Sequence, residues 1–383
     1  MKVALVILHA DPARGGAERY TFDLAQALAA RGVAVSLLAS SFGPEPAGMT
    51  LVKLDDRGLT RLGKYRRFLQ SLDAHLAETT YDVVHAMLPV HWCDVYHPHA
   101  GVAAEAIVSG HRKHGGALKQ QVAAVSNRLN VKRRAFANVE RALLTGPKPP
   151  IVLCLSEYVK GTVRAHYPLA EDRLATLFNA VDLEKFDPAR RPECRGAIRK
   201  QFGIDAGRTV GLMIAQDFAR KGLEPALRAL ARLANRPLLV VVGKEDPSSY
   251  RRLAEELGVA ADVIFAGATN DPYAFYQAAD FFILPTRHDP CSLVVLEALA
   301  MGLPVISTRQ NGACEIMTPG EQGYVLADAD DSEALVAAIT SMCDDTTRRS
   351  MRERCLALRP RLAYETHLRT LLAIYGRASS RAV

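Results

Sequence analysis

The sequence has 383 residues, which at roughly 150 residues per domain predicts two or three domains and argues against a single small binding module. Hydrophobic residues make up 49% and charged residues 23%, an ordinary globular composition that excludes a disordered, collagen-like or coiled-coil protein. The net charge is +7, and residues 111–141 alone hold eight Lys or Arg and one Glu, so the excess is one local patch that suggests an anionic partner.

The first half of the chain alternates strand patterns with helix patterns. Short apolar runs predict strands at residues 3–8, 33–39, 83–87 and 151–155. Residues 16–31 repeat apolar side chains at helical spacing, which together with the first two strands predicts a βαβ unit. Ser156 is a predicted helix N-cap. No apolar run approaches eighteen residues, and the first is too short for a signal peptide, so we expect no membrane span.

A second alternation of strands and helices begins near residue 209. Its strand patterns lie at residues 210–215, 238–243, 263–266, 281–284 and 304–307. We therefore expect an α/β protein with two Rossmann-like, doubly wound domains facing a central cleft. Residues 179–188 are polar and turn-prone and form the expected hinge, which divides the chain into domains at 1–178 and 179–360.

Seven cysteines are spread along the chain without any C-x-x-C spacing. An odd, scattered set disfavours both a disulfide framework and a zinc site. Reduced thiols predict a cytoplasmic protein, with peripheral attachment to the inner face of the cytoplasmic membrane as an option.

Nucleotide-binding fingerprints are absent from the sequence. Neither G-x-G-x-x-G nor a P-loop follows any predicted strand, which argues against a dehydrogenase or an ATPase. Gly15 and Gly16 do follow the first strand, where paired glycines let a ligand approach backbone N–H groups, although a Gly-Gly pair is more often just a turn.

Two cations, Arg220 and Lys221, lie just past the first strand of the second half and before a predicted helix. Adjacent cations at the edge of a sheet and beside a helix N-terminus suit a diphosphate. Solvated surface charge is the alternative.

The segment that starts at Asp289 follows the predicted strand 281–284 and opens another helix. Its first turn holds Cys291 and Ser292, whose N–H groups are expected to be free for an anion or a sugar hydroxyl. Asp289 and Glu297 place a carboxylate at each end of this stretch, and carboxylates are natural acceptors for ribose or hexose hydroxyls. The alternative is an acid beside the helix dipole and an exposed helical Glu.

Taken in order, these segments resemble the GT-B glycosyltransferases of family 4 over essentially the whole chain. The resemblance rests on Gly-Gly-Ala-Glu-Arg at 15–19, Arg-Lys-Gly at 220–222, and an acid, seven residues and a Glu before Ala-Leu-Ala-Met-Gly-Leu-Pro-Val-Ile at 298–306. Within the family the chain is most similar to the lipopolysaccharide-core α-glucosyltransferases that act on heptose. That similarity is carried by Asp217-Phe-Ala-Arg-Lys-Gly, by Asp94-Val-Tyr96 and by the basic segment.

The resemblance implies roles for individual residues. It assigns donor binding to Gly15, Gly16, Arg220, Lys221, Cys291, Ser292 and Glu297. In the family pattern the cations hold the diphosphate of a nucleotide sugar, the Glu accepts the ribose hydroxyls, and the glycines let the first loop approach the phosphates. Asp289 would face the transferred sugar, and His99 would lie near it, with His97 as the alternative histidine. The family also implies that a helix at 361–383 crosses back to the first domain.

The same resemblance implies a retaining reaction without a metal ion or cofactor, in which the leaving phosphate takes the acceptor's proton and fixed cations stabilise the departing charge. Asp328-Ala-Asp330 matches the D-x-D metal motif of the other glycosyltransferase fold, but its place before Ser332 favours helix capping.

Three departures from the family pattern concern the sugar more than the reaction. Asp289 stands in place of the usual first Glu, Cys291-Ser292 stand in place of Phe-Gly, and Gln216 stands where many members have Arg.

The basic segment, residues 111–141, has the pattern of an amphipathic helix. Its apolar stripe consists of Leu118, Val122, Val125 and Leu129. The basic side chains largely off that stripe are Lys119, Arg128, Lys132 and Arg134. This pattern suits an anionic membrane surface or a phosphorylated lipid acceptor, and a solvated helix packed on the body is the alternative. Phe136 is the only aromatic residue in the segment, so nucleic acid is not expected as a partner.

These observations predict a retaining glycosyltransferase that moves a hexose, glucose by resemblance, from a UDP-sugar to a lipid-linked saccharide such as lipopolysaccharide core. A UDP-sugar epimerase of the same fold is one alternative. The other is a basic membrane- or nucleic-acid-binding protein with a vestigial sugar site.

Overall fold

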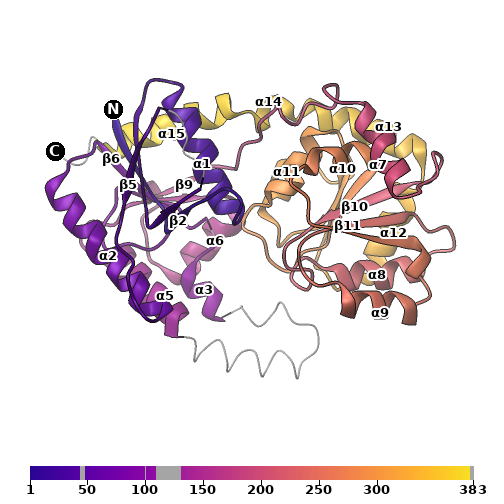
Figure 1. Ribbon diagram of the computed structural model, residues 1–383, viewed down its shortest axis with the longest axis horizontal. Coiled ribbons are helices and arrows are strands. Elements are labelled where there is room, and N and C mark those ends of the chain that lie inside the picture. Colours follow the sequence, from indigo (N-terminus) through magenta and orange to yellow (C-terminus); the bar gives the residue numbers. More distant parts are fainter. Residues whose placement is uncertain (44–47, 100, 109–130, 380–383) are drawn as a thin grey trace. The chain divides into compact units, whose positions relative to one another are not determined.

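The computed structural model describes residues 1–43, 48–99, 101–108 and 131–379, and its contacts divide the chain into two compact units. The N-terminal unit comprises Met1–Asn179 and the chain from Tyr364 onward, and the C-terminal unit comprises Ala180–Ala363. Each is built on a parallel sheet with helices packed against it (Figure 1). The two doubly wound α/β units predicted from the sequence are confirmed.

The N-terminal unit has a seven-stranded parallel sheet in the order β5-β3-β1-β6-β7-β8-β9. Its strands are β1 (Lys2–Val6), β3 (Ala34–Ala39), β5 (Thr50–Lys53), β6 (Val83–Ala86), β7 (Val95–Tyr96), β8 (Ile151–Cys154) and β9 (Leu174–Thr176). A second, two-stranded sheet pairs β2 (His9–Ala10) with β4 (Ser41–Phe42). The strands predicted from apolar runs correspond to β1, β3, β6 and β8, which are buried along most of their length because helices cover the sheet.

The helices of the N-terminal unit are α1 (Gly16–Ala29), α2 (Arg61–Glu78), α3 (Ala103–Val108), α5 (Val131–Thr145), α6 (Glu157–His166), α15 (Tyr364–Ser379) and the short η1 (Glu171–Arg173). The Ser156 hydroxyl accepts from the Val159 N–H at 3.2 Å, so the predicted N-cap of α6 is confirmed. The last helix, α15, shares the apolar core with α1. The Tyr20 hydroxyl of α1 lies 2.9 Å from Nε2 of His367 in α15. This packing explains why a segment at the end of the sequence belongs to the first unit.

The C-terminal unit has a six-stranded parallel sheet in the order β12-β11-β10-β13-β14-β15. The strands are β10 (Val210–Ile214), β11 (Leu238–Val242), β12 (Val263–Gly267), β13 (Phe281–Leu284), β14 (Val305–Thr308) and β15 (Gly323–Leu326). The helices are α7 (Glu193–Gln201), α8 (Leu223–Ala231), α9 (Ser248–Glu256), α10 (Pro272–Ala278), α11 (Leu293–Ala300), α12 (Ser332–Met342), α13 (Asp345–Ala357) and α14 (Arg359–Leu362), with the short η2 (Ala260–Asp262) and η3 (Gly312–Ile316). All five predicted strands are present.

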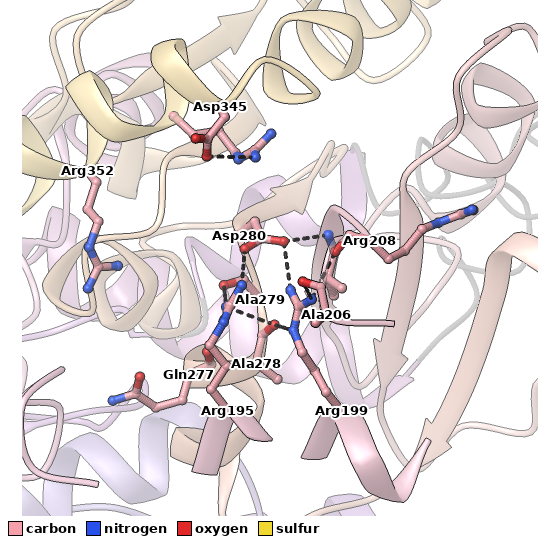
Figure 2. A network of polar contacts seen from close by, with 12 residues as sticks. Arg195, Arg199, Ala206, Arg208, Gln277, Ala278, Ala279, Asp280, Asp345 and Arg352 are labelled. Atoms are coloured by element: carbon pink, nitrogen blue, oxygen red, sulfur yellow. Dashed lines mark hydrogen bonds and ion pairs between the residues drawn. The ribbon is translucent and has the colours of Figure 1, made fainter. Parts of the chain in front are cut away.

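An ionic network ties the amino ends of β10 and β13 to α7 (Figure 2). Asp280 precedes β13 and accepts from the Val210 N–H at 2.8 Å and from Arg195 and Arg199 at 2.6 and 2.9 Å. The Arg199 residue is 5% exposed and also donates to four backbone carbonyls, so its charge is compensated by hydrogen bonds rather than by water. The network is at the opposite end of these strands from the loops that hold the predicted donor residues.

The chain passes between the units at two points. One is between Asn179 and Ala180, at the start of the turn-prone stretch 179–188. The other is at Ala363, which has extended backbone between α14 and α15. Arg361 therefore lies in α14 of the C-terminal unit, and the last helix begins at Tyr364.

Candidate active site

Most of the predicted site residues of the C-terminal unit lie in loops at the carboxyl ends of adjacent strands, and Glu297 lies on α11. Arg220 and Lys221 follow β10, and Asp289 follows β13. β10 and β13 are hydrogen-bonded neighbours, and β14 lies on the other side of β13. Because parallel strands end at the same edge of a sheet, this edge is where doubly wound units bind ligands.

The Arg220–Lys221 turn is fixed by Asp217 and Gly222. The Asp217 carboxylate accepts from the Arg220 N–H at 3.0 Å, and its carbonyl accepts from the Lys221 N–H at 3.0 Å. Gly222 has φ 81°, and a Cβ there would lie 2.0 Å from the carbonyl oxygen of Pro285. Only glycine fits both the left-handed backbone and this close approach. The turn is thereby pressed against the loop that follows β13.

Lys221 and Asp289 form an ion pair in which the ammonium group donates directly to the carboxylate. The two residues are 8% and 7% exposed. Burial alone would raise the pKa of Asp289, but the charges of Lys221 and Arg220 outweigh it and hold that pKa below its ordinary value. Asp289 is therefore an ionised acceptor with a fixed orientation.

Arg220 is held beside this pair. Its guanidinium donates to the carbonyl of His288 at 2.9 Å, and its Nε lies 3.4 Å from the Asp217 carboxylate. Its side chain keeps about a third of its surface exposed, at 30%. The structure thus brings together Arg220, Lys221 and Asp289, which the sequence placed in two separate motifs.

Asn311, after β14, holds the loop that carries Asp289 and Ser292. Its side-chain oxygen accepts from the Ser292 N–H at 3.3 Å, and its amide donates to the Ser307 hydroxyl at 3.1 Å. The backbone of Asp289 is hydrogen-bonded to Gln310 and Gly312 on either side of Asn311. The expectation that the Ser292 N–H is free for a ligand is therefore wrong, because Asn311 occupies it. Cys291 is buried beside it.

Glu297 lies on α11 and is oriented by Tyr276 of α10. The Tyr276 hydroxyl donates to the Glu297 carboxylate at 2.8 Å. Burial, reinforced by Glu297, raises the pKa of Tyr276 well above its ordinary value, so this hydroxyl stays a donor. Glu297 itself is half-buried, which leaves part of its side chain accessible.

The remaining predicted residues lie in the N-terminal unit. Gly15 is the N-cap of α1 with φ −179°, an extended backbone that any residue adopts, and α1 begins at Gly16. His99 is 8% exposed, with its Nε2 3.2 Å from the side-chain oxygen of Asn179. His97 is fully buried, and burial lowers its pKa well below the ordinary value. Of the two histidines, only His99 keeps any exposed surface.

The D-x-D sequence does not cap a helix as predicted. Asp331 is the N-cap of α12 and accepts from the Ala334 N–H at 3.1 Å. Asp330 instead pairs with Arg287, and Asp328 accepts from the Asp330 N–H at 2.7 Å. Within the described ranges, no group of three or more His, Cys, Asp or Glu side chains is arranged to hold a metal ion.

Asn311, Tyr276 and Arg287 were not identified from the sequence. Each acts through a partner distant in the chain, at Ser292, Glu297 and Asp330 respectively. No local pattern marks such residues, and only the Pro-Val-Ile strand just before Asn311 was a signal that its loop would reach this edge of the sheet.

Most of the basic segment lies outside the described residues, including Leu118, Lys119, Val122, Val125, Arg128 and Leu129. Its last part, residues 131–141, lies in α5. There Phe136 stacks on Tyr65 with ring centroids 4.1 Å apart, so it packs within the unit. Among the described residues, no helix combines the length and apolar character needed to cross a membrane.

Two family models match consecutive parts of this chain. The model described as Glycosyltransferase Family 4 matches residues 14–185, and the model described as Glycosyl transferases group 1 matches residues 195–356. With its two doubly wound units, the chain belongs to the GT-B glycosyltransferases of this group.

Individual relatives place it within the group. The lipopolysaccharide glucosyltransferase WaaG of Escherichia coli (strain K12) is 27% identical over 326 residues, 84% of this chain and 84% of that protein. The crystal structure of WaaG, a glycosyltransferase involved in lipopolysaccharide biosynthesis, matches with a TM-score of 0.78 and 26% identity over 94% of this chain and 95% of that one. HepE from Anabaena, solved with UDP and glucose, shares the fold with a TM-score of 0.70 and 17% identity over 100% of this chain and 99% of that one. The protein is a glycosyltransferase related to the lipopolysaccharide-core glucosyltransferases.

Proposed function

We propose that this glycosyltransferase transfers a hexose, glucose, from a UDP-sugar to a lipid-linked saccharide such as lipopolysaccharide core, with retention of configuration and without a metal ion. The observation that carries the proposal is the cluster of Arg220, Lys221 and Asp289 at one edge of the C-terminal sheet. The relation to WaaG supports glucose and the lipopolysaccharide acceptor. The complex of HepE with UDP and glucose supports a uridine nucleotide.

Arg220 and Lys221 bind the diphosphate of the donor. As the bond between the sugar and the phosphate breaks, negative charge builds up on the phosphate oxygens. A guanidinium already fixed by His288 and Asp217, next to the Lys221 ammonium, stabilises that charge without reorganising.

Asp289 and Glu297 orient the two sugars of the donor. Asp289 is held in one orientation by Lys221, so it accepts a hydrogen bond from a hydroxyl of the transferred sugar at little entropic cost. Glu297, oriented by Tyr276, accepts the ribose hydroxyls. The backbone at Cys291 completes the sugar-facing side, and Ser292 contributes through the fold of the loop because Asn311 occupies its N–H.

The reaction proceeds by attack on the same face of the sugar that the phosphate leaves. The acceptor oxygen forms a bond to the anomeric carbon, the bond from that carbon to the phosphate oxygen breaks, and the hydroxyl proton passes to the leaving phosphate. No protein nucleophile takes part, so no pair of carboxylates about 5–5.5 Å apart is required.

Gly15, Gly16 and His99 contribute to the donor site from the N-terminal unit, with His99 near the transferred sugar.

Residues 111–141 bind an anionic membrane surface and so bring a cytoplasmic enzyme to a lipid-linked acceptor. Replacing Lys132, Arg133 and Arg134 by Glu should abolish binding to anionic liposomes, and unchanged binding contradicts this role.

Calorimetric titration with UDP and UDP-glucose tests the donor site. Lys221→Ala and Glu297→Ala should each weaken binding by about tenfold to a hundredfold, the range for hydrogen bonds to charged groups. Arg349→Ala and Glu353→Ala on α13 are controls that should bind as the wild type does, because both side chains are exposed on that helix. Undiminished binding by the first two variants refutes the assignment. An altered sugar after incubation with UDP-glucose alone would identify an epimerase instead.

A further inference from the structure

Glu140 is a fully buried carboxylate in the N-terminal unit. It lies on α5 and is 0% exposed. Among the residues that the structure describes, every hydrogen bond that it accepts comes from a neutral donor. A buried carboxylate is costly unless its oxygens are fully hydrogen-bonded, so this arrangement calls for a physical reason.

Four donors surround the two oxygens of Glu140. One oxygen accepts from the Tyr96 hydroxyl at 2.6 Å and the Ala103 N–H at 3.0 Å. The other accepts from the Tyr167 hydroxyl at 2.8 Å and the Ala104 N–H at 3.1 Å. Burial and then the charge of Glu140 raise the pKa of both tyrosines, which keeps their hydroxyls protonated. Each of the two oxygens accepts two hydrogen bonds, which suits an ionised carboxylate.

Three of these donors, Tyr96, Ala103 and Ala104, flank the histidine pair in the chain. Tyr96 ends β7, His97 and His99 follow, and Ala103 begins α3. Glu140 therefore holds the chain immediately before and shortly after the two histidines. His99 itself makes a contact with Asn179 at 3.2 Å and lies against the Tyr20 ring with centroids 4.6 Å apart.

We propose that Glu140 is a positioning residue that sets the place of His99 by fixing the chain on both sides of it. The catalytic part of this inference rests on the proposed contact between His99 and the donor sugar. A carboxylate is needed because the two N–H groups of Ala103 and Ala104 can only donate. A glutamine would offer one oxygen and turn its NH₂ toward the other N–H.

Glu140→Gln, with side-chain nitrogen NMR of labelled histidines, tests the proposal. The His99 signals, assigned with a His99→Gln variant, should shift or double in Glu140→Gln. The control Glu78→Gln, at an exposed position of α2, should leave them unchanged. The value of kcat should fall by about tenfold or more, as expected for a misplaced contact, while the Kd for UDP stays within about twofold. A folded Glu140→Gln protein with unchanged His99 signals and unchanged kcat overturns the proposal.

Tyr167→Phe is a milder second variant that removes one donor and leaves three. It should shift the same His99 signals by a smaller amount, and unchanged signals in this variant also contradict the role of Glu140, including when Glu140→Gln fails to fold. The NMR readout does not depend on catalysis. If the wild type transfers no sugar from any nucleotide sugar, the proposed function fails, while the His99 signals still decide whether Glu140 positions that residue.

Discussion

Lys221 and Asp289 carry opposite charges and are both less than one-tenth exposed, so each compensates the charge of the other. Taking an ion out of water costs several kcal/mol, which a well-placed partner offsets. Removing either side chain leaves a buried charge without its main partner. At the residue scale, the pair therefore serves the stability of the loops as well as the proposed binding of a donor.

Single and double substitutions of this pair separate the two effects. Lys221→Met and Asp289→Asn should each destabilise the C-terminal unit by about 3–5 kcal/mol, and the double variant by much less than the sum. Arg228→Met, which breaks an exposed pair with Glu224 on α8, should cost less than about 1 kcal/mol. Urea unfolding measures all four proteins. Additive effects of the two substitutions at Lys221 and Asp289 would show that the pair is not coupled.

At the scale of elements, the turn between β10 and α8 decides where the cations lie. Gly222 caps α8 and touches the backbone at the end of β13, so the two loops of the candidate site share one contact. A change in this turn should alter binding as well as stability.

Gly222→Ala and Gly203→Ala form a matched pair for this turn. Both glycines have positive φ, 81° and 64°, but a Cβ at Gly203 would meet nothing within 4 Å. Gly203→Ala should therefore cost about 1 kcal/mol from backbone strain alone. Gly222→Ala should cost clearly more and also weaken UDP binding, as measured by thermal unfolding and calorimetry. Equal costs with normal UDP binding would contradict the role of this contact.

The elements of the fold were predictable to different degrees. Buried parallel strands such as β10, β11 and β13 are nearly continuous apolar runs, so the sequence predicts them directly. Strands of two or three residues, such as β7 and β9, were not predicted, because so short a run has no period. The prediction of a free N–H at the start of α11 was wrong, because its partner Asn311 lies 19 residues away in the chain and no local pattern connects the two.

The residues of the candidate site were also predictable to different degrees. Arg220, Lys221, Asp289 and Glu297 were identified because they lie next to predicted strand ends and match a family pattern. The pairing of Lys221 with Asp289 joins positions 68 residues apart and depends on the neighbouring places of β10 and β13 in the sheet. Sheet order of this kind is a tertiary property that spacing along the chain does not contain.

For the whole molecule, buried histidines distinguish the two units. In the N-terminal unit, burial lowers the pKa of His85 to about 3, of His367 to about 4, and of His97 well below its ordinary value. The C-terminal unit has a single histidine, His288, which is not fully buried. The two units should therefore respond differently to acid.

Acid should weaken the N-terminal unit first. These histidines become protonated below pH 6.5 in the unfolded chain, whereas the folded unit keeps them neutral. The stability that they contribute is therefore fully present above that pH and is lost as the pH falls toward 4. In this window each buried histidine lowers the free energy of unfolding by about 1.4 kcal/mol for each unit by which the pH falls. The fluorescence of Trp92, the only Trp in the chain, follows the N-terminal unit, and hydrogen exchange in β10 and β13 follows the other.

Two variants check the source of this acid response. His85→Gln and His367→Gln should each make the pH dependence shallower by about one proton. Equal loss of stability in both units between pH 6.5 and 4.5 would show that the buried histidines do not govern it.

Transfer of a sugar to an acceptor is the property that all of these features are proposed to serve. The wild-type protein, Asp289→Asn and Lys221→Ala are each incubated with UDP-glucose and a heptose-containing lipopolysaccharide core, and the product is analysed by mass spectrometry and NMR. We predict that the wild type adds one hexose in the α configuration and that both variants are slower by about a hundredfold or more. A folded wild type that binds UDP-glucose but adds no hexose to the core, or variants that transfer at the wild-type rate, would contradict the proposed function.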